Sequence, residues 1–239
     1  MKIYVKGKEI ELDTSKKPFG KGSEGVLYEK EGILYKIYYP EQLNEGYGQK
    51  EKHHNYLLSI PTKQVVLPLE AIYDERGEYI GYTTKKLVDK PNERTGIIKM
   101  PKEKFIKNLL ILEEDVALLA DRYVLQADVT PFNYIFNSSD STMNIIDPGR
   151  YRHHTKELKW MYYFQNNQQL KELIMILLLL DFYEYKPIGS KRKSQLLRDL
   201  IKEKFINFRG QNLSEFFEEE LDKYESVYEY SKTLGKYIK

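Results

Sequence analysis

Short apolar runs alternate with polar turns over the first third of the chain. The runs are KIYV and EIEL, separated by KGK, and GVLYEK and ILYKIYY, separated by Glu31-Gly32. Runs of this length that are rich in β-branched and aromatic residues and bounded by glycine or charged residues are typical of strands. They predict antiparallel hairpins, continued by strands over 65–73 and 79–84 on either side of a turn at 74–77.

A different pattern interrupts these strands between residues 45 and 60. The stretch EGYGQKEKHHNYLLSI is mostly polar, has a spacing that a helix tolerates, and is followed by Pro61. Proline ends helices because it lacks an amide hydrogen and restricts the residue before it. We therefore expect one helix inserted among the strands.

Beyond residue 90 the apolar positions follow a helical period. They recur at steps of four, three, four and three, at Phe105, Leu109, Leu112, Val116 and Leu119. This spacing is the stripe of an amphipathic helix. The turn-like sequence PNERTGIIKMPKE precedes it, so we expect a boundary between a β-rich part and a helical part near residues 88–95.

The remaining segments predict a short hairpin and three helices. Two β-like stretches, 134–136 and 143–146, are bridged by NSSDST, which is a turn by composition. The almost wholly apolar stretch 170–182 favours a buried helix, and amphipathic helices are expected over 194–208 and 213–230. The longest apolar run, 173–180, is far shorter than the roughly 18 residues of a membrane span, so none is expected.

Composition narrows the class of protein. The chain has 239 residues, and its 38 Lys and Arg nearly balance 36 Asp and Glu, for a net charge of +2. This lacks the basic footprint of a nucleic-acid binder, so no nucleic-acid partner is expected. The absence of cysteine excludes disulfides, thiolate metal sites and thiol nucleophiles. It suits the cytoplasm, where we expect the protein, and the amino end lacks the apolar region of a signal peptide.

The first candidate for chemistry is a glycine-rich motif, formed by Gly20, Lys21, Gly22, Ser23, Glu24 and Gly25. This GxGxxG pattern is weak alone. A dinucleotide fold needs it between a strand and a helix, whereas Gly25 continues directly into an expected strand. The glycines are therefore expected in a hairpin, either over a ligand's phosphates or in a turn that binds nothing.

Eleven residues further on, Lys36 lies in the strand ILYKIYY. The alternation of that strand directs Lys36 to the same apolar face as Leu34. A lysine on an apolar face is costly unless it is paired, and Glu51, on the expected helix, is a candidate partner. The alternative is that Lys36 is an ordinary surface residue.

The densest cluster of polar residues comes later in the chain. Asp128 is followed five positions on by Asn133, and Asp147-Pro148-Gly149 comes after the next expected strand. This places three oxygen ligands on two adjacent loops, the kind of set that Mg²⁺ prefers together with phosphate oxygens. Each aspartate alone could equally be a turn or cap residue.

In order and spacing, these motifs resemble the protein-kinase superfamily from about residue 19 to residue 149, and more loosely through 170–180. The closest description is a small, atypical, bacterial-type Ser/Thr kinase-like protein with a shortened activation segment. The resemblance implies an α+β, two-lobed kinase-like fold: a β-rich N-lobe with one helix, residues 1–88, and an α-helical C-lobe, residues 89–239.

The resemblance also implies a site for ATP and Mg²⁺. Residues 20–25 would cover the phosphates, Lys36 would bind the α- and β-phosphates, and Glu51 would hold Lys36. Asp128 would be the catalytic aspartate, and Asn133 and Asp147 the metal ligands. The adenine ring would be enclosed by Phe19, Leu27, Leu34 and Ile135, and would pair with a hinge over 84–88.

Several residues depart from the family pattern. Gln126-Ala127 stands where His-Arg is common, which removes the usual partner of a phosphorylated activation loop. Thr130 replaces a phosphate-contacting lysine, and Pro148 replaces the phenylalanine of Asp-Phe-Gly. Only about seventeen residues separate Gly149 from the apparent start of the apolar helix, and no Ala-Pro-Glu follows. The peptide-docking segment is therefore expected to be truncated.

These observations predict a kinase that moves the γ-phosphate of MgATP to a hydroxyl acceptor, with Ser or Thr of a protein as the first choice. Loss of the docking segment favours a small-molecule hydroxyl as an alternative. A catalytically inactive pseudokinase that serves as a binding scaffold is a third possibility. The complete set of Lys36, Asp128, Asn133 and Asp147 argues against the third.

Overall fold

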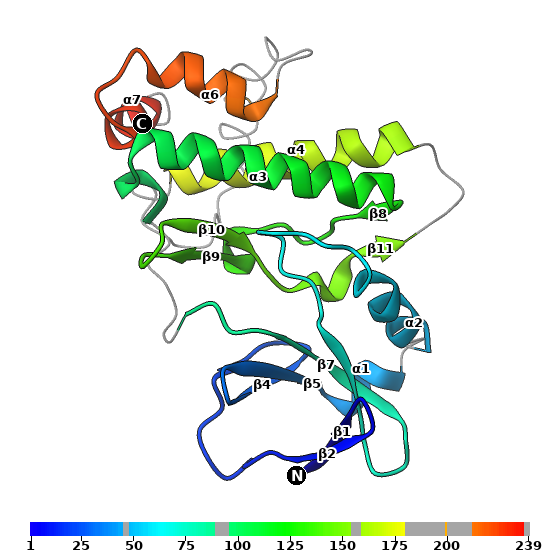
Figure 1. Ribbon diagram of the computed structural model, residues 1–239. Coiled ribbons are helices and arrows are strands. Elements are labelled where there is room, and N and C mark those ends of the chain that lie inside the picture. Colours follow the sequence, from blue (N-terminus) through cyan, green and yellow to red (C-terminus); the bar gives the residue numbers. More distant parts are fainter. Residues whose placement is uncertain (45–47, 89–95, 154–158, 180–198, 200–211, 237–239) are drawn as a thin grey trace.

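The computed structural model describes residues 1–44, 48–88, 96–153, 159–179, 199 and 212–236. It is a mixed α+β fold. The strands of the first third form one curled antiparallel sheet at one end of the molecule, and the long helices gather at the other end (Figure 1). The α+β class expected from the sequence is confirmed.

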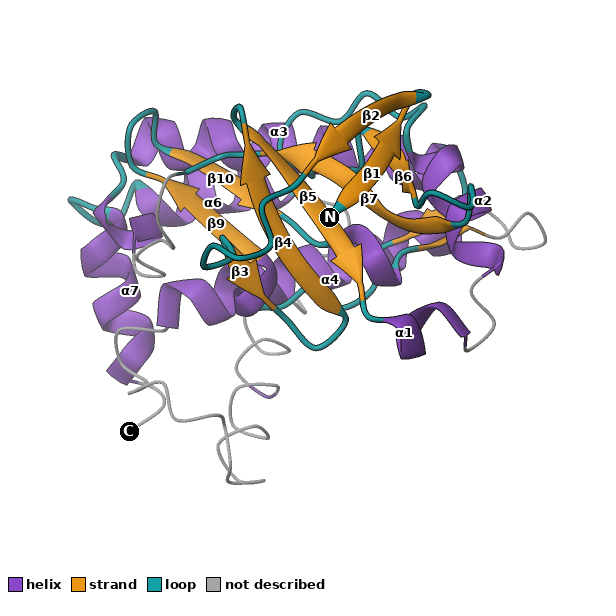
Figure 2. Cartoon of the chain, turned by 90° about the horizontal axis from the view of Figure 1, so that it is seen from below, coloured by secondary structure: helices purple, strands orange, loops and turns teal. Residues whose placement is uncertain are grey.

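The sheet has seven strands in the order β2-β1-β6-β7-β5-β4-β3, and every neighbouring pair is antiparallel. Figure 2, which views the molecule from the sheet end, shows the strands in front of the helices. The predicted hairpins β1–β2 and β4–β5 are confirmed. The strands are β1 (Lys2–Val5), β2 (Lys8–Glu11), β3 (Gly20–Lys21), β4 (Gly25–Lys30), β5 (Ile33–Tyr38), β6 (Glu70–Tyr73) and β7 (Tyr79–Lys85).

The strand predicted over 65–73 begins only at Glu70. The residues before Glu70 form backbone hydrogen bonds with β10 (Thr142–Ile145) instead. Val66 N–H donates to the Ile145 carbonyl (2.8 Å), and Ile145 N–H donates to the Gln64 carbonyl (2.9 Å). Pro68 has no amide hydrogen to give to a ladder. The apolar pattern of this stretch therefore marks burial against the second half of the chain.

Two helices, rather than the one predicted, lie between β5 and β6. The short α1 (Pro40–Asn44) has proline at its first position, where the missing amide hydrogen costs nothing. It is followed by α2 (Gly48–Leu57), which corresponds to the predicted helix over 45–60 and ends three residues before its predicted end.

The second half of the chain is mainly helical. Its two pairs of short strands are β9 with β10, which the sequence predicts, and β8 with β11, which it does not. Among its described residues are also three short 3₁₀ helices: η1 (Gly96–Lys99), η2 (Pro131–Asn133) and η3 (Pro148–Arg150). The other elements are α3 (Lys102–Asp121), β8 (Val124–Leu125), β9 (Tyr134–Asn137), β10 (Thr142–Ile145), β11 (Arg152–His153), α4 (Lys159–Leu179), α6 (Leu213–Leu221) and α7 (Val227–Lys236).

Two helix predictions need correction. The helix predicted over 170–182 begins at Lys159, because its polar first half is held by hydrogen bonds that an apolar pattern does not reveal. The single helix predicted over 213–230 is two helices. Ser226 Oγ accepts from Glu229 N–H (3.2 Å) and so caps a new helix at Val227. Apart from residue 199, the helix predicted over 194–208 lies outside the described residues.

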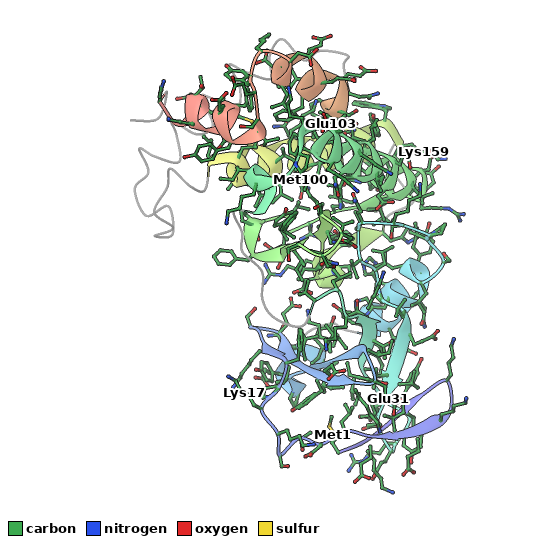
Figure 3. The ribbon with its side chains drawn as sticks, turned by 60° about the vertical axis from the view of Figure 1, so that its left-hand side comes forward. Met1, Lys17, Glu31, Met100, Glu103 and Lys159 are labelled. Carbon is green, nitrogen blue, oxygen red and sulfur yellow. The ribbon has the colours of Figure 1, made fainter. Side chains whose placement is uncertain are left out.

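The main hydrophobic core lies among α3, α4, α6 and α7. Met100, labelled beside these helices in Figure 3, is 4 % exposed and belongs to it. A smaller cluster around Ile3 and Ile72 lies on the sheet. Four residues from the first third of the chain, Leu57, Ile60, Val65 and Leu67, pack into the main core. Within the described residues, no helix is long and apolar enough to cross a membrane.

Candidate functional site

One cavity of about 500 Å³ contains nearly all of the residues that the sequence singles out. Its volume falls in the range of roughly 300–1,000 Å³ that small-molecule sites occupy. It lies between the sheet and the loops that follow β8 and β10. The predicted residues that line it are Phe19, Gly20, Lys21, Gly22, Ser23, Glu24, Gly25, Leu27, Leu34, Lys36, Asp128, Asn133, Ile135 and Asp147.

The glycine-rich motif forms the β3–β4 hairpin, with Gly20 paired to Leu27. Gly22 N–H donates to the Gly25 carbonyl (3.0 Å), which closes the turn. A Cβ at Gly25 would overlap the Ile37 carbonyl oxygen of β5, so this position requires glycine. The hairpin predicted from the sequence is confirmed, and its turn borders the cavity.

Apolar side chains form one part of the cavity wall. Leu27 and Leu34 come from the sheet, and Ile135 and Ile146 come from the second half of the chain. Residues 84, 85, 87 and 88 of the predicted hinge also line the cavity. An apolar wall of this kind suits a flat aromatic ring.

Lys36 points into the cavity from β5, on the same face as Leu34, as the alternation predicts. The residue is only 7 % exposed, so its ammonium group needs anionic partners. It forms ion pairs with Asp147 Oδ1 and with Glu24 Oε2 (3.5 Å). It also lies 5.5 Å from the ring centroid of Tyr38 and 5.6 Å from that of Tyr82, within the range of cation–π attraction.

The predicted partner of Lys36 is wrong. Glu51 lies on α2 as expected, but it accepts a hydrogen bond from the Tyr73 hydroxyl (2.7 Å) on β6. Glu51 does not line the cavity, and no ion pair within the described residues joins it to Lys36. The helix packs against β6 and β7, which directs Glu51 away from β5. Glu24, from the glycine-rich turn, takes its place.

The three candidate oxygen ligands lie on two loops that are bonded to each other. Asn133 donates its side-chain N–H to the Asp128 carbonyl (2.8 Å), and Ile146 N–H donates to the Asn133 carbonyl (2.8 Å). Asp128 and Asp147 have φ of 62° and 61°. Such left-handed conformations are unfavourable for residues other than glycine by roughly 1–3 kcal/mol and cluster at functional sites.

Tyr82 completes the contacts around Asp147. Its hydroxyl donates to Asp147 Oδ1 (3.4 Å). Burial raises the pKa of Tyr82 well above its ordinary value, and the nearby Asp147 charge adds to this. Tyr82 is therefore a neutral donor at physiological pH, and it helps to keep Asp147 in place.

Arg150, which the sequence analysis did not single out, also lines the cavity. Its Nε lies 3.3 Å from Glu24 Oε1 and its Nη1 lies 3.7 Å from Asp128 Oδ2. The hydrogen bond to Glu24, followed by the Asp128 charge, raises the pKa of Arg150. The only signal in the sequence was its position directly after Asp147-Pro148-Gly149.

Five charged groups are thus in direct contact: the cations Lys36 and Arg150 and the carboxylates of Glu24, Asp128 and Asp147. The cluster carries a net charge of −1. Its three carboxylates attract a divalent cation, which would neutralise part of the charge on a polyanion bound in the same cavity. Lys21 and Lys85 line the same cavity and add positive charge at its border.

The donor set fits a hard divalent cation. Asn133 and Asp147 offer an amide and a carboxylate oxygen, and the bond from Asn133 to Asp128 orients the amide so that its oxygen remains available. Two protein oxygens are a usual share for Mg²⁺, which keeps water or phosphate oxygens as its other ligands. No cluster of three His, Cys, Asp or Glu side chains suited to a metal occurs in the described parts of the chain.

No protein-family model matches the chain, and no curated protein matches it. The functional argument therefore rests on the geometry of this cavity.

Proposed function

We propose that this protein is an ATP-dependent phosphotransferase with a two-lobed, protein-kinase-like fold. The observation that carries the proposal is the direct ion pair between Lys36 and Asp147, which are 111 positions apart in the sequence. Both lie in one cavity with the glycine-rich turn, Asp128 and Asn133. Phosphoryl transfer needs these groups because it depends on positioning and on charge neutralisation.

Each part of the cavity has a role in this proposal. The apolar wall between Leu27, Leu34 and Ile135 takes the adenine ring, and the backbone of 84–88 pairs with the ring's edge. The amides of the glycine-rich turn and the Lys36 ammonium bind the phosphates. Asp128 accepts a hydrogen bond from the acceptor hydroxyl and orients it toward the terminal phosphate.

Asn133 and Asp147 hold Mg²⁺ in this proposal. When bound, the ion neutralises charge on the phosphate oxygens. The chain's own contribution is rigidity: the Tyr82 hydroxyl and the Lys36 ammonium hold Asp147, and the Asp128 carbonyl holds Asn133. These ligands are therefore positioned before the reaction and need little reorganisation during it.

The first choice of acceptor is Ser or Thr of a protein, and a small-molecule hydroxyl is the second. The second is favoured by the short distance along the chain from Arg150, where η3 ends, to Lys159, where α4 begins. Few residues remain there to bind an extended peptide. A pseudokinase that binds nucleotide without turnover is the remaining alternative.

The first test measures the melting temperature with ATP, with and without Mg²⁺. Ligand at about 100 times its dissociation constant stabilises by roughly 2.7 kcal/mol, and each kcal/mol shifts the midpoint by about 2–4 °C at this size. We expect a Mg²⁺-dependent rise that shrinks in Asp147→Asn. The exposed Asp121→Asn variant is the control and should behave as wild type. No rise in wild type would overturn the proposal.

The second test asks whether the phosphate is transferred. We expect Asp128→Ala to reduce phosphate transfer from ATP by about 10²–10⁴-fold, the usual share of a positioned base, with ATP affinity nearly unchanged. Transfer is measured with labelled ATP to the protein itself, to a protein mixture and to small alcohols. Binding without transfer or ATP hydrolysis would favour the pseudokinase, and full turnover in the variant would remove Asp128 from the mechanism.

A further inference from the structure

Glu24 bridges the two cations of the cavity. One carboxylate oxygen lies 3.5 Å from Lys36 Nζ and the other lies 3.3 Å from Arg150 Nε. The same carboxylate lies against the backbone of Gly149, where a Cβ would come within 2.9 Å of Glu24 Oε2. Its side chain is only 13 % exposed. Lys36 and Arg150 therefore flank one position that accepts an anionic group.

Each cation has a second carboxylate that does not depend on Glu24. Lys36 contacts Asp147, and Arg150 contacts Asp128. The two cations thus stay in place if the Glu24 carboxylate moves aside. Glu24 lies on the turn between β3 and β4, so its movement requires no change in the helices.

The position between these cations is also the place where the phosphates of a nucleotide would lie. Its two flanking cations touch Asp128, which orients the acceptor in the proposed function, and Asp147, which holds the metal. Arginine binds phosphate better than a point charge does, because its planar fork offers two parallel N–H groups. The Arg150 side chain is 58 % exposed, so a ligand can reach it without displacing a core residue.

We infer that Lys36 and Arg150 together bind the phosphate chain of a nucleoside triphosphate, and that Glu24 is a built-in competitor for the same two cations. This inference rests on the proposed function and deepens it. Lys36 contacts the inner phosphates, and Arg150 contacts the γ-phosphate beside Asp128. Arg150 is then the residue that distinguishes ATP from ADP, and Glu24 sets how tightly either nucleotide binds.

The test compares ATP and ADP binding in Mg²⁺ by calorimetry at equal salt. We expect Arg150→Gln to weaken ATP binding about tenfold, the loss of one charge-assisted hydrogen bond, and to change ADP binding less than about twofold. Arg150→Lys keeps the charge without the fork and should fall between. Arg152→Gln, an exposed arginine that does not line the cavity, is the matched control and should bind as wild type.

The Glu24→Gln variant tests whether the Glu24 carboxylate competes with the nucleotide for Lys36 and Arg150. The isosteric amide removes the anion and should tighten ATP binding by about three- to tenfold, in proportion to roughly one weakened ion pair. If the variant binds ATP more weakly, Glu24 instead positions Lys36 and the competitor role is overturned. Circular dichroism of each variant establishes that it is folded before binding is compared.

The outcomes separate this inference from the proposed function. If wild type binds neither nucleotide, the proposed function falls and this inference falls with it. If wild type binds both and Arg150→Gln weakens both equally, or neither, only the role of Arg150 is overturned. Selective loss of ATP binding in Arg150→Gln, with tighter binding in Glu24→Gln, supports the inference.

Discussion

Two glycines allow the backbone to approach β5 closely from both sides. Gly25 of β4 pairs with Tyr38, and Gly81 of β7 pairs with Ile37. A Cβ at Gly25 would overlap the Ile37 carbonyl oxygen, and one at Gly81 would overlap the Lys36 carbonyl oxygen. The strand that carries Lys36 therefore keeps its ladder only because these two neighbours lack side chains.

Gly81→Ala is expected to destabilise the protein by at least about 1–3 kcal/mol, the usual cost of forcing atoms into a packed region. Each kcal/mol corresponds to roughly 2–4 °C in the melting temperature. Gly22→Ala is the matched control, because its Cβ would meet only the Gly25 carbonyl oxygen at 4.0 Å. Thermal unfolding by circular dichroism measures both. Equal midpoints for the two variants would contradict the close approach.

At the scale of single residues, the sequence predicts which face of a strand a side chain lies on better than it predicts which residue that side chain pairs with. The alternation of β5 places Lys36 and Leu34 on one face, and both line the cavity. The ionic partner of Lys36 was predicted on the wrong element. Whether the Glu51 carboxylate can contact Lys36 depends on where α2 packs against the sheet, and the sequence does not show that position. Glu51 accepts a hydrogen bond from Tyr73 instead, and the glycine-rich turn places Glu24 beside the lysine.

The first half of α4 supports the loop that carries Asp128. Asn166 accepts from Gln126 N–H (2.8 Å) and donates to the Val124 carbonyl (2.9 Å). Gln169 donates to the Gln126 carbonyl (2.7 Å). These polar contacts explain why the apolar pattern placed the start of this helix too late, since the helix is held there by hydrogen bonds to a loop distant in sequence.

Asn166→Ala is expected to lower both stability and the proposed phosphate transfer. It leaves a buried N–H and a buried carbonyl without partners, each costing about 1–3 kcal/mol, and it loosens the approach to Asp128. The neighbouring Asn167→Ala removes an amide that makes no such bond and should behave as wild type. Urea unfolding and the transfer rate are the measurements. Wild-type turnover in folded Asn166→Ala would show that the loop needs no such support.

The helix α6 is held at both ends by α3. Glu113 accepts from the backbone N–H groups of Leu213 and Ser214 at its start, and Lys102 donates to the Leu221 carbonyl (3.2 Å) near its end. A negative charge at the start and a positive charge at the end of a helix both match its dipole. Two charged residues of α3 thus fix where α6 sits.

Glu113→Ala is expected to destabilise the protein by about 1–2 kcal/mol, since it removes a helix N-terminal acceptor and a favourable charge. The adjacent Glu114→Ala removes only a surface ion pair to Lys63, worth at most about 1 kcal/mol, and serves as the control. Chemical unfolding with both variants gives the comparison. A larger loss in Glu114→Ala than in Glu113→Ala would be inconsistent with capping of α6.

At the scale of the whole molecule, the segment between α2 and β6 packs against the helical part of the chain. Asp115 of α3 accepts backbone N–H groups from residues 63, 64 and 65, and Val65 lies beside Ile145 in a parallel bridge. The periodic patterns of the chain predict the two kinds of structure and their order. They do not predict this junction, because its contacts are about 50 residues or more apart in sequence.

Because of these contacts between the first third of the chain and the helices, we expect that the first 88 residues do not fold alone. Leu57, Ile60, Val65 and Leu67 are all less than 8 % exposed and pack into the main core. Removing that core would expose each of them, at about 1.5–3 kcal/mol per side chain, against a typical total stability of only 5–15 kcal/mol. The small cluster on the sheet offers little to offset this loss.

We therefore expect the fragment 1–88 to show no cooperative thermal transition, and the full chain to unfold in a single one. Tyrosine fluorescence and far-ultraviolet circular dichroism should give the same midpoint for the full chain, because the sheet and the helices share one core. A well-folded fragment, or two separate transitions in the full chain, would mean that the contacts of residues 57–67 contribute little. The sheet would then be an independent unit, and the binding of ATP would have to bring the sheet and the helices together.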